Sequence, residues 1–249
     1  MANLLGAVEI TKNKFIRKQT IGLMKIQRRK LYAVITGDIV ASSRFSKNDR
    51  KKLYHVMKDG GDTLCRVFGK AVVPMKVDIF RGDGWQLLIT DPVKSLRVGL
   101  FYRAFLRVGM QNNKADTRMA IAVGTIDFIP GERVSDGDGE AYRKSGGALE
   151  KMSKSSLICF VLAGEKSEGR HDAIEVVVQL LDVLAMNWTE KQAQAIIGAL
   201  QGWTQQEIAT SWRNKPISQQ AVGQHLNRAG RHAVDKGITF FENSLRELL

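Results

Sequence analysis

Apolar residues in positions 31–165 form two kinds of pattern, short continuous runs and stripes at helical spacing. The run Leu31–Thr36 is continuous and predicts a buried strand that ends at the polar turn Gly37-Asp38. From Leu53 to Phe68 the apolar residues recur at helical spacing, which predicts a helix lying on a sheet and capped by Ser46. The later patterns predict strands over 72–80 and 85–90, a helix from 91 to about 110, a strand over 118–125, a helix over 140–152 and a strand over 157–163.

This order of elements predicts a βαββαβ sheet with an added helix and strand, an α+β fold with helices on one face. The polar, glycine-containing segment 164–172 predicts a linker, and no later segment has the pattern of a strand. Helices are predicted over 174–186, from Thr189, over 204–212, over 218–229 and over 238–249. We therefore expect a tail over residues 1–30, an α+β domain over 31–165 and an all-α domain over 170–249.

The composition is that of an ordinary globular protein, with 44% hydrophobic and 25% charged residues. No apolar run approaches the roughly 18 residues that span a bilayer, and the first residues lack the features of a secretory signal. Cys65 and Cys159 stand among apolar neighbours, as buried thiols do in a reducing compartment. These features predict a cytoplasmic protein without a membrane partner.

Half of the net charge of +13 lies in residues 1–30, where eight Lys and Arg face a single Glu. A basic tail of this kind favours a polyanion such as nucleic acid. A merely solvated tail is an equally good interpretation, and Met24 offers an alternative start that would remove the first 23 residues.

Two Gly-Asp pairs suggest a ligand site. Asp38 ends the first predicted strand, and Asp83 lies in a tight hairpin turn on a neighbouring strand. Two such carboxylates can hold Mg²⁺ or Mn²⁺, which in turn binds a triphosphate. The residues expected to contact the nucleotide are Gly37, Ile39, Val40, Ala41, Ser42, Ser43 and Gly82. The alternative is that both pairs are ordinary turns.

Residues 204–231 have the order of a DNA-reading helix-turn-helix, namely a helix, a turn and a second helix that starts at Ser218. Ile208, Ala209, Val222 and Leu226 would form the core between the helices. The residues expected to meet double-stranded DNA are Ser218, Gln219, Gln220, Gln224, His225, Arg228 and Arg231. The spacing between the helices is longer than is usual for the motif, so an ordinary helical hairpin is the alternative.

The segments TGDIVASS, GDGWQLLI, RMAIAVGTI and GDGEAYRKSGGALEKM occur in an order that resembles class III nucleotidyl cyclase domains. The chain is more similar still to the SatD family, bacterial proteins that pair a cyclase-like domain with a C-terminal helix-turn-helix. The resemblance covers about residues 31–230. It implies a cyclase-like βαββαβ sheet, with Asp38 and Asp83 as metal ligands.

The sequence departs from the cyclase pattern where catalysis would need it. Residues 137–150 contain no Asn, so the cyclase Asn-x-x-x-Arg spacing is not met, and Ile79 stands where a base-selecting Lys would be. Only Arg143 or Lys144 could supply the catalytic positive charge. We therefore expect a DNA-binding regulatory protein, a homodimer whose cyclase-like domain senses a nucleotide or metal. The alternatives are a divergent nucleotidyl cyclase that uses two metal ions, and an interaction module without a ligand.

Overall fold

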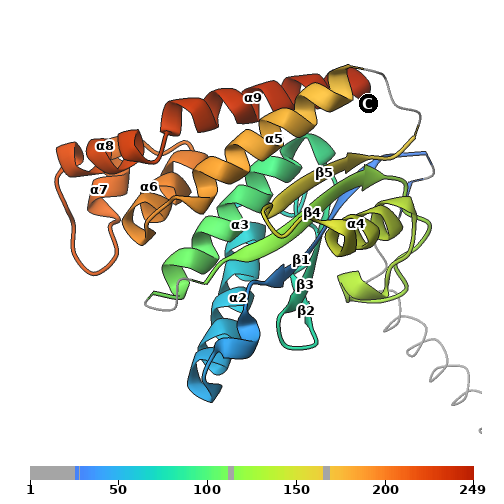
Figure 1. The fold of residues 1–249 in the computed structure, drawn as a ribbon, viewed down its shortest axis with the longest axis horizontal. Helices are drawn as coiled ribbons and strands as arrows, with labels where there is room; N and C mark the ends of the chain where they lie inside the picture. The colour runs from blue at the N-terminus through green and yellow to red at the C-terminus, as the bar shows by residue number, and fades with distance from the viewer. Residues whose placement is uncertain (1–25, 28, 112–114, 165–168) are drawn as a thin grey trace, which may run out of the picture.

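The structure, a computed structural model, describes residues 26–27, 29–111, 115–164 and 169–249. Most of the predicted tail and part of the predicted linker lie outside this range. The described residues form an α+β fold with a five-stranded mixed sheet in the order β2-β3-β1-β4-β5 (Figure 1). The strands are β1 (Tyr32–Ile39), β2 (Asp78–Phe80), β3 (Gly84–Ile89), β4 (Thr117–Gly124) and β5 (Ile158–Leu162). The helices are α2 (Lys47–Phe68), α3 (Ser95–Gly109), α4 (Glu140–Lys151), α5 (Arg170–Met186), α6 (Glu190–Leu200), α7 (Gln205–Thr210), α8 (Gln219–Arg228) and α9 (Arg231–Leu248).

Strand β1 lies at the centre of the sheet because it pairs antiparallel with both β3 and β4. Strand β2 extends the sheet beside β3, and β5 pairs parallel to β4. The apolar run that predicted β1 is buried on both faces of the sheet, as expected for a central strand. The strand is longer than predicted and includes Gly37 and Asp38, so Asp38 lies within the ladder and not in a turn after it.

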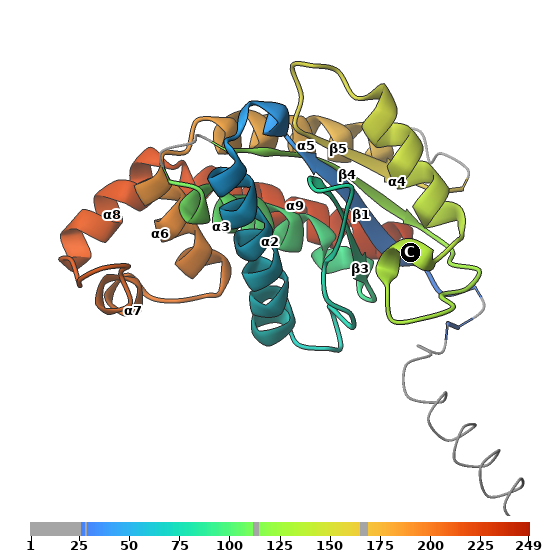
Figure 2. The same cartoon turned by 90° about the horizontal axis from the view of Figure 1, so that it is seen from below.

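Helices cover both faces of the sheet, so the prediction that they share one face is wrong for α4. Ala33, Ile35 and Ile39 belong to the main core, to which α2 and α3 contribute. Tyr32 and Val34 point to the other face and form a second apolar cluster with residues of α4 and of the loop before it. Figure 2 shows α4 on the opposite side of the sheet from α2 and α3. The second cluster exists because consecutive strand residues point to opposite faces and β1 is apolar at both.

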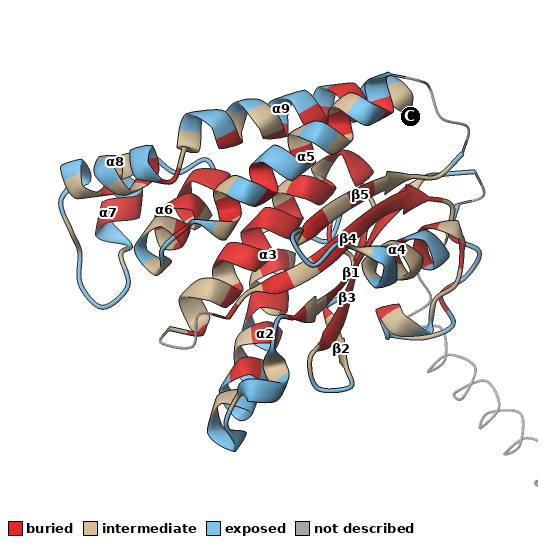
Figure 3. Ribbon diagram, viewed as in Figure 1, coloured by how far each residue is buried: buried red, intermediate tan, exposed pale blue. Residues whose placement is uncertain are grey.

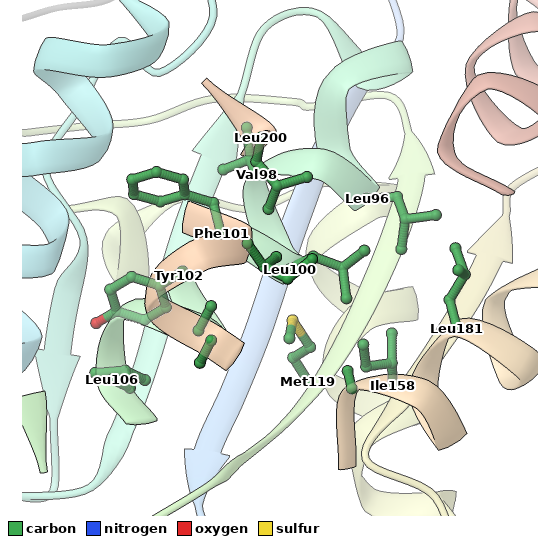
Figure 4. Close-up of a cluster of buried hydrophobic side chains, with 14 of the residues drawn as sticks. Leu96, Val98, Leu100, Phe101, Tyr102, Leu106, Met119, Ile158, Leu181 and Leu200 are labelled. Atoms are coloured by element: carbon green, nitrogen blue, oxygen red, sulfur yellow. The ribbon is translucent and has the colours of Figure 1, made fainter. Parts of the chain in front are cut away.

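The helices after β5 share the main core with the sheet. Helix α5 packs on β5, α6 packs on α3, and α9 lies along α5. Figure 4 shows side chains of α3 in one cluster with the strand residues Met119 and Ile158 and with Leu181 and Leu200 from α5 and α6. The predicted all-α domain is therefore fixed on the sheet by continuous apolar packing.

Several predicted boundaries are confirmed by their capping residues. Ser46 caps α2, Asp91 precedes the helical segment that starts at Pro92, and Thr189 forms a capping box at α6. The strand predicted over 72–80 is wrong in its first half, because the N–H groups of Val72 and Val73 both donate to Gly69 in a turn. Only Asp78–Phe80 pairs as β2.

Helix α9 starts seven residues before the predicted Ile238, at Arg231. Gly230 (φ 73°) separates it from α8, in a left-handed conformation that glycine adopts without strain. Val234 is buried and precedes Ile238 by one turn, so the apolar spacing of the helix extends into its first turn, which the prediction missed. Among the described residues, no helix is long and apolar enough to cross a membrane.

Both cysteines are free thiols and are half-buried, Cys65 in α2 and Cys159 in β5. Burial and the nearby carboxylates of Glu175 and Asp182 raise the pKa of the Cys159 thiol to about 12. Cys159 is therefore a protonated, weakly nucleophilic group at neutral pH.

Glu242 of α9 joins that helix to the start of α3. Its carboxylate accepts hydrogen bonds from Lys94 Nζ at 2.9 Å and from Arg97 Nε at 2.8 Å. Burial alone would raise the pKa of Glu242, but the hydrogen bonds from Arg97 and Lys94 outweigh it and hold the pKa below its ordinary value. A lowered folded-state pKa stabilises the fold above the unfolded-state pKa, and this stability is lost as the pH falls through the folded-state value.

We expect Glu242→Gln to lower the free energy of unfolding at pH 7 by about 1–2 kcal/mol, because it replaces two charge-assisted hydrogen bonds with weaker ones. The difference from the wild type should stay constant down to about pH 5 and shrink below about pH 4.5, where the unfolded glutamate takes up its proton. Urea titrations of both proteins between pH 4 and 7 measure this. An equal difference at both ends of the range would show that the carboxylate is not stabilised by these partners.

Candidate functional site

Asp38, the predicted metal ligand, forms an ion pair with Arg118, which lies opposite it on β4. Arg118 Nε donates to Asp38 Oδ1 at 3.0 Å, and the second guanidinium nitrogen donates to Oδ2. This is the two-pronged geometry in which a guanidinium matches a carboxylate best. The hydrogen bonds that Arg118 donates to Asp38 raise the pKa of Arg118 above its ordinary value. The negative charge of Asp38 is thus already compensated within the sheet.

Asp83 lies in the turn between β2 and β3, beside the end of β1. Arg81 (φ 53°) and Gly82 (φ 89°) form this turn with positive φ angles. The Asp83 carbonyl accepts a hydrogen bond from Ile39 N at 3.2 Å, and the Asp83 carboxylate accepts one from the Ser42 hydroxyl. The fold therefore brings the second Gly-Asp pair next to the loop that follows the first one.

These two aspartates do not fit a two-metal site as they stand. Both oxygens of Asp38 are bound by Arg118, and a metal ion there would have to displace this guanidinium. Within the described ranges, no group of three or more His, Cys, Asp or Glu side chains has the arrangement of a metal site. Metal binding at Asp38 would therefore require its ion pair with Arg118 to open.

The loop after β1 has fewer free N–H groups than the phosphate-binding prediction requires. Ile39 N donates to Asp83, and Val40 N donates to the Asp116 carbonyl at 2.9 Å. Ile39 is also buried in the main core, so both residues are structural and the prediction that their N–H groups meet phosphate is wrong. The Val40 side chain, Ala41 (φ 54°), Ser43 and Arg44 are exposed, and Ser42 is half-buried.

Gly37, also predicted to contact nucleotide, has a packing role. A Cβ atom on Gly37 would lie 2.5 Å from the Trp85 ring and 2.6 Å from the Arg118 carbonyl oxygen. Since real Cβ atoms do not approach other atoms so closely, only glycine fits there. Trp85 itself is fully buried, and its Nε1 donates to Thr117 Oγ1 at 2.8 Å.

A cleft of about 840 Å³ opens between this loop, the start of α2 and the turn before β3. Ser42, Ser43, Gly82 and Asp83 line it, as do basic side chains that the sequence analysis did not single out. The basic residues are Lys47, Arg50, Lys51 and Arg81, with His55 beside them. Since Asp83 is their single acidic neighbour in this lining, the cleft favours an anion.

Arg50 also stabilises the wall of the cleft. Its guanidinium donates to the carbonyl oxygens of Ser43 at 2.9 Å and Phe45 at 3.1 Å. The side chain thereby fixes the loop that follows β1 against the first turns of α2.

Arg143 and Lys144, the candidates for a catalytic charge, lie on α4 and so on the other face of the sheet from α2. Arg143 donates to Asp138 Oδ1 at 2.8 Å and pairs with Asp127. Lys144 is exposed and, like Arg143, is not part of the cleft lining. The described chain thus does not bring either side chain to the basic cleft. Ile79, at the position of the base-selecting Lys, is half-buried against the main core.

Helices α6, α7 and α8 pack on one another at the end of the molecule away from α4 (Figure 1). The four residues predicted to form the core between α7 and α8 are all buried in the main core. Ser218 caps α8 by accepting a hydrogen bond from Ala221 N at 3.2 Å. Gln219, Gln220, Gln224 and Arg228 are exposed on α8.

Two other predicted DNA contacts have partners inside the protein. The His225 ring stacks on Trp212 with centroids 5.5 Å apart and planes at 14°. Burial and the positive charges of Lys191 and Arg228 lower the pKa of His225 below its ordinary value, so the ring is neutral at pH 7. Arg231 Nε donates to Asp235 Oδ2 at 3.2 Å. His225 therefore supports the packing of α8, and Arg231 is partly neutralised.

The basic side chains of α2 and the partner of Asp38 could not be found from a local motif. Lys47, Arg50 and Lys51 fall on the polar side of a helix whose apolar stripe was recognised, and such charges are usually solvated. Arg118 opens the segment RMAIAVGTI, but only the antiparallel register of β1 and β4 sets it against Asp38. Comparison of the chain with models of known protein families gives no match, and comparison with curated proteins gives none either.

Proposed function

We propose that this chain is a DNA-binding regulatory protein in which α7 and α8 form a helix-turn-helix and α8 contacts the major groove. The observation that carries the proposal is the division of α8 into two faces. Val222 and Leu226 are buried against α7, while Gln219, Gln220 and Gln224 are exposed near the start of the helix. Glutamine side chains can pair with adenine edges through two hydrogen bonds, and Arg228 is placed one turn further on for a phosphate.

The long connection between the two helices also supports the proposal, because it is held in a defined place. Ile217 N donates to the Ala209 carbonyl at 3.1 Å and closes the segment 211–218 against the end of α7. Arg213 donates to the Val108 carbonyl of α3 at 2.8 Å. A connection fixed at both points would hold α8 at one angle to α7, as a reading helix requires.

The proposed family is the SatD family, and the proposed finer fold is the cyclase-like βαββαβ sheet. The element order β1-α2-β2-β3-α3-β4 and the strand order β2-β3-β1-β4 support it. All neighbouring pairs among these four strands are antiparallel, as that arrangement requires. In this proposal the protein consists of a DNA-binding module joined to a sheet that binds a ligand.

Arg228→Ala and Gln220→Ala separate phosphate contact from base readout. We expect Arg228→Ala to weaken binding to all duplexes by about tenfold and to reduce the slope of log affinity against log salt by about 1. Gln220→Ala should weaken binding about tenfold to the preferred site only. Fluorescence anisotropy with the DNA upstream of the protein's own coding sequence, and with a scrambled duplex, measures both at several salt concentrations.

Lys154→Ala is the matched control, because this exposed Lys lies in the turn before β5, away from α8. It removes one positive charge and should change neither affinity nor salt slope beyond the scatter of the measurement. Two results would refute a DNA-reading role for α8. One is a wild-type protein that does not bind DNA at low salt, and the other is unchanged DNA binding by all three variants.

We also propose that the basic cleft binds a nucleotide and that this ligand is what the sheet senses. The support is the cluster of Lys47, Lys51 and Arg81 around the Ser42–Asp83 hydrogen bond. Point charges and hydroxyl groups of this kind suit the oxygens of a triphosphate. Asp38 would not contact the nucleotide itself. It would keep Arg118 and the end of β1 in place.

A ligand that binds only the folded state raises the melting temperature. We expect at least one nucleoside triphosphate to do so for the wild type, and we expect Lys51→Ala/Arg81→Ala to weaken its affinity at least about tenfold. Lys52→Ala is the control, because Lys52 is exposed on the same turn of α2 but does not line the cleft. If none of the four nucleoside triphosphates changes the melting temperature, the proposal that the cleft binds a nucleotide is refuted.

The alternative function, a divergent nucleotidyl cyclase or a related two-metal enzyme, rests on Asp83 lining that same cleft. It is tested in the same samples by adding Mg²⁺ or Mn²⁺ and measuring released pyrophosphate. Turnover that Asp38→Ala abolishes would establish the enzyme and displace the sensor. We expect no turnover, because Arg143 and Lys144 lie on a helix that packs on the other face of the sheet.

A further inference from the structure

Helix α5 has two apolar faces, and one of them lies in solvent. Ile174, Val178, Leu181 and Ala185 form the buried face, which packs on the main core. Val176, Leu180 and Val183 lie on the other side and are 53%, 62% and 54% exposed. They are spaced four and three residues apart, so they form one stripe along the helix. Figure 3 shows exposed positions along α5.

Helix α9 extends this stripe. It runs antiparallel to α5, since Gly230 lies beside Leu184 and Gly237 lies beside Leu181. Phe240, which is 39% exposed, follows Gly237 by one helical turn on the side of α9 that contacts α5. Four large apolar side chains thus form a single exposed surface, which we call the α5 stripe. Contiguous exposed apolar side chains often mark an interaction site.

We propose that the α5 stripe is a dimer interface, with a second copy of this chain as its occupant and the two α5 helices antiparallel. A two-fold axis at Leu180 places the Leu180 side chains of both copies together. Val176 of one copy then meets Val183 of the other, and the reverse, because their distances from Leu180 along the helix are nearly equal. The stripe is therefore complementary to itself, as a two-fold interface requires.

Charge favours a second copy in this orientation. The exposed Asp172 lies at the N-terminal end of α5, and Glu175 near it is paired with His171. The C-terminal end of α5 lies beside the start of α9, where Lys236 is exposed and Arg231 is paired with Asp235. Arg170 and Glu247 at the acidic end neutralise each other. An antiparallel pair sets the acidic end of each copy opposite the basic end of the other, whereas a parallel pair would set like charges together.

This interface goes beyond the proposed DNA-binding activity and is measured without DNA, so either proposal can fail alone. If both hold, the interface supplies the pairing that a two-fold operator requires, with one α8 near each end of the α5 pair. The spacing of the two half-sites would then be set by α5, which at 17 residues is about 25 Å long.

A cysteine at the axis tests the geometry directly. With a mild oxidant, we expect Leu180→Cys to give a covalent dimer that a reducing agent reverses. Phe128→Cys is the matched control, because Phe128 is 52% exposed and follows β4, away from the stripe. The wild type, whose Cys65 and Cys159 are half-buried, gives the background. Equal cross-linking of the Leu180→Cys and Phe128→Cys proteins would overturn the proposal.

Sedimentation equilibrium gives the second readout. We expect a wild-type dimer whose dissociation constant rises at least about tenfold in Leu180→Glu and does not change in Phe128→Glu. Removal of residues 1–23 should leave the dissociation constant unchanged. A wild type that stays monomeric, a Leu180→Glu variant that dimerises normally, or a dimer lost with residues 1–23 would each refute the interface.

Discussion

Asp182→Ala is expected to lower the free energy of unfolding by about 3–5 kcal/mol, the largest effect of a single substitution that this fold predicts. Arg103 and Asp182 are 1% and 2% exposed and are joined by a hydrogen bond of 2.6 Å. Burial alone would lower the pKa of Arg103, but Asp116 and Asp182 outweigh it and raise the pKa above its ordinary value. The substitution leaves this buried positive charge with one carboxylate instead of two.

The same substitution also removes the partner of two backbone groups. Asp182 Oδ2 accepts hydrogen bonds from Leu157 N at 2.7 Å and Ile158 N at 3.1 Å, at the start of β5. Unpaired buried N–H groups add to the cost. Asp182 thus joins α5 both to the sheet and to α3, in addition to the apolar packing between these elements.

Urea unfolding at pH 7 measures the effect of Asp182→Ala. Asp59→Ala removes an exposed acid from α2 and should change the free energy of unfolding by less than about 0.5 kcal/mol. Asp182→Asn keeps an acceptor oxygen, so its effect on the free energy of unfolding should lie between the effects of Asp182→Ala and Asp59→Ala. If Asp182→Ala costs no more than Asp59→Ala, the helical part is held to the sheet by apolar packing alone.

Gly37→Ala should cost about 2–3 kcal/mol, because the new methyl group meets the ring of Trp85 and a backbone carbonyl that cannot move independently. Trp85 is fixed by burial and by its hydrogen bond to Thr117. The hydroxyl of Thr117 in turn donates to the Asp38 carbonyl at 2.7 Å. A shift of the Trp85 ring in Gly37→Ala would therefore also move Thr117, which holds the backbone of Asp38.

Gly146→Ala is the opposite control for Gly37→Ala. Gly146 lies within α4, and a Cβ atom there would meet no described atom within 4 Å outside its own helix. Alanine should therefore stabilise the helix by about 0.5–1 kcal/mol. Trp85→Phe should relieve part of the cost of Gly37→Ala, which makes the double variant more stable than the sum of its parts predicts. If the effects of Gly37→Ala and Trp85→Phe on the free energy of unfolding simply add, the Trp85 ring is not what opposes a methyl group at position 37.

The elements of this fold follow from local sequence pattern. The apolar run of β1, the stripe of α2 and the Thr189 capping box depend on residues close in sequence, and all three are confirmed. The face of the sheet on which α4 lies does not follow from local sequence pattern. Both faces of β1 are apolar, and which helix covers each face depends on residues far away in the sequence.

The pairing of charges could not be predicted for the same reason. Asp38 and Arg118 are 80 residues apart, and Arg103 and Asp182 are 79 apart. Both pairs depend on strand register and helix packing. The sequence shows a carboxylate near the end of a strand, and only the register of β1 and β4 shows that an arginine lies opposite it.

The central claim, that α8 is the surface that meets DNA, is tested most directly by photo-cross-linking. A photoreactive residue in place of Gln220 should cross-link the protein to a duplex that it binds. The same residue in place of Lys144, which is exposed on α4, should not. Cross-linking no stronger from position 220 than from position 144, with DNA bound in both samples, would contradict the claim and move DNA binding to another surface.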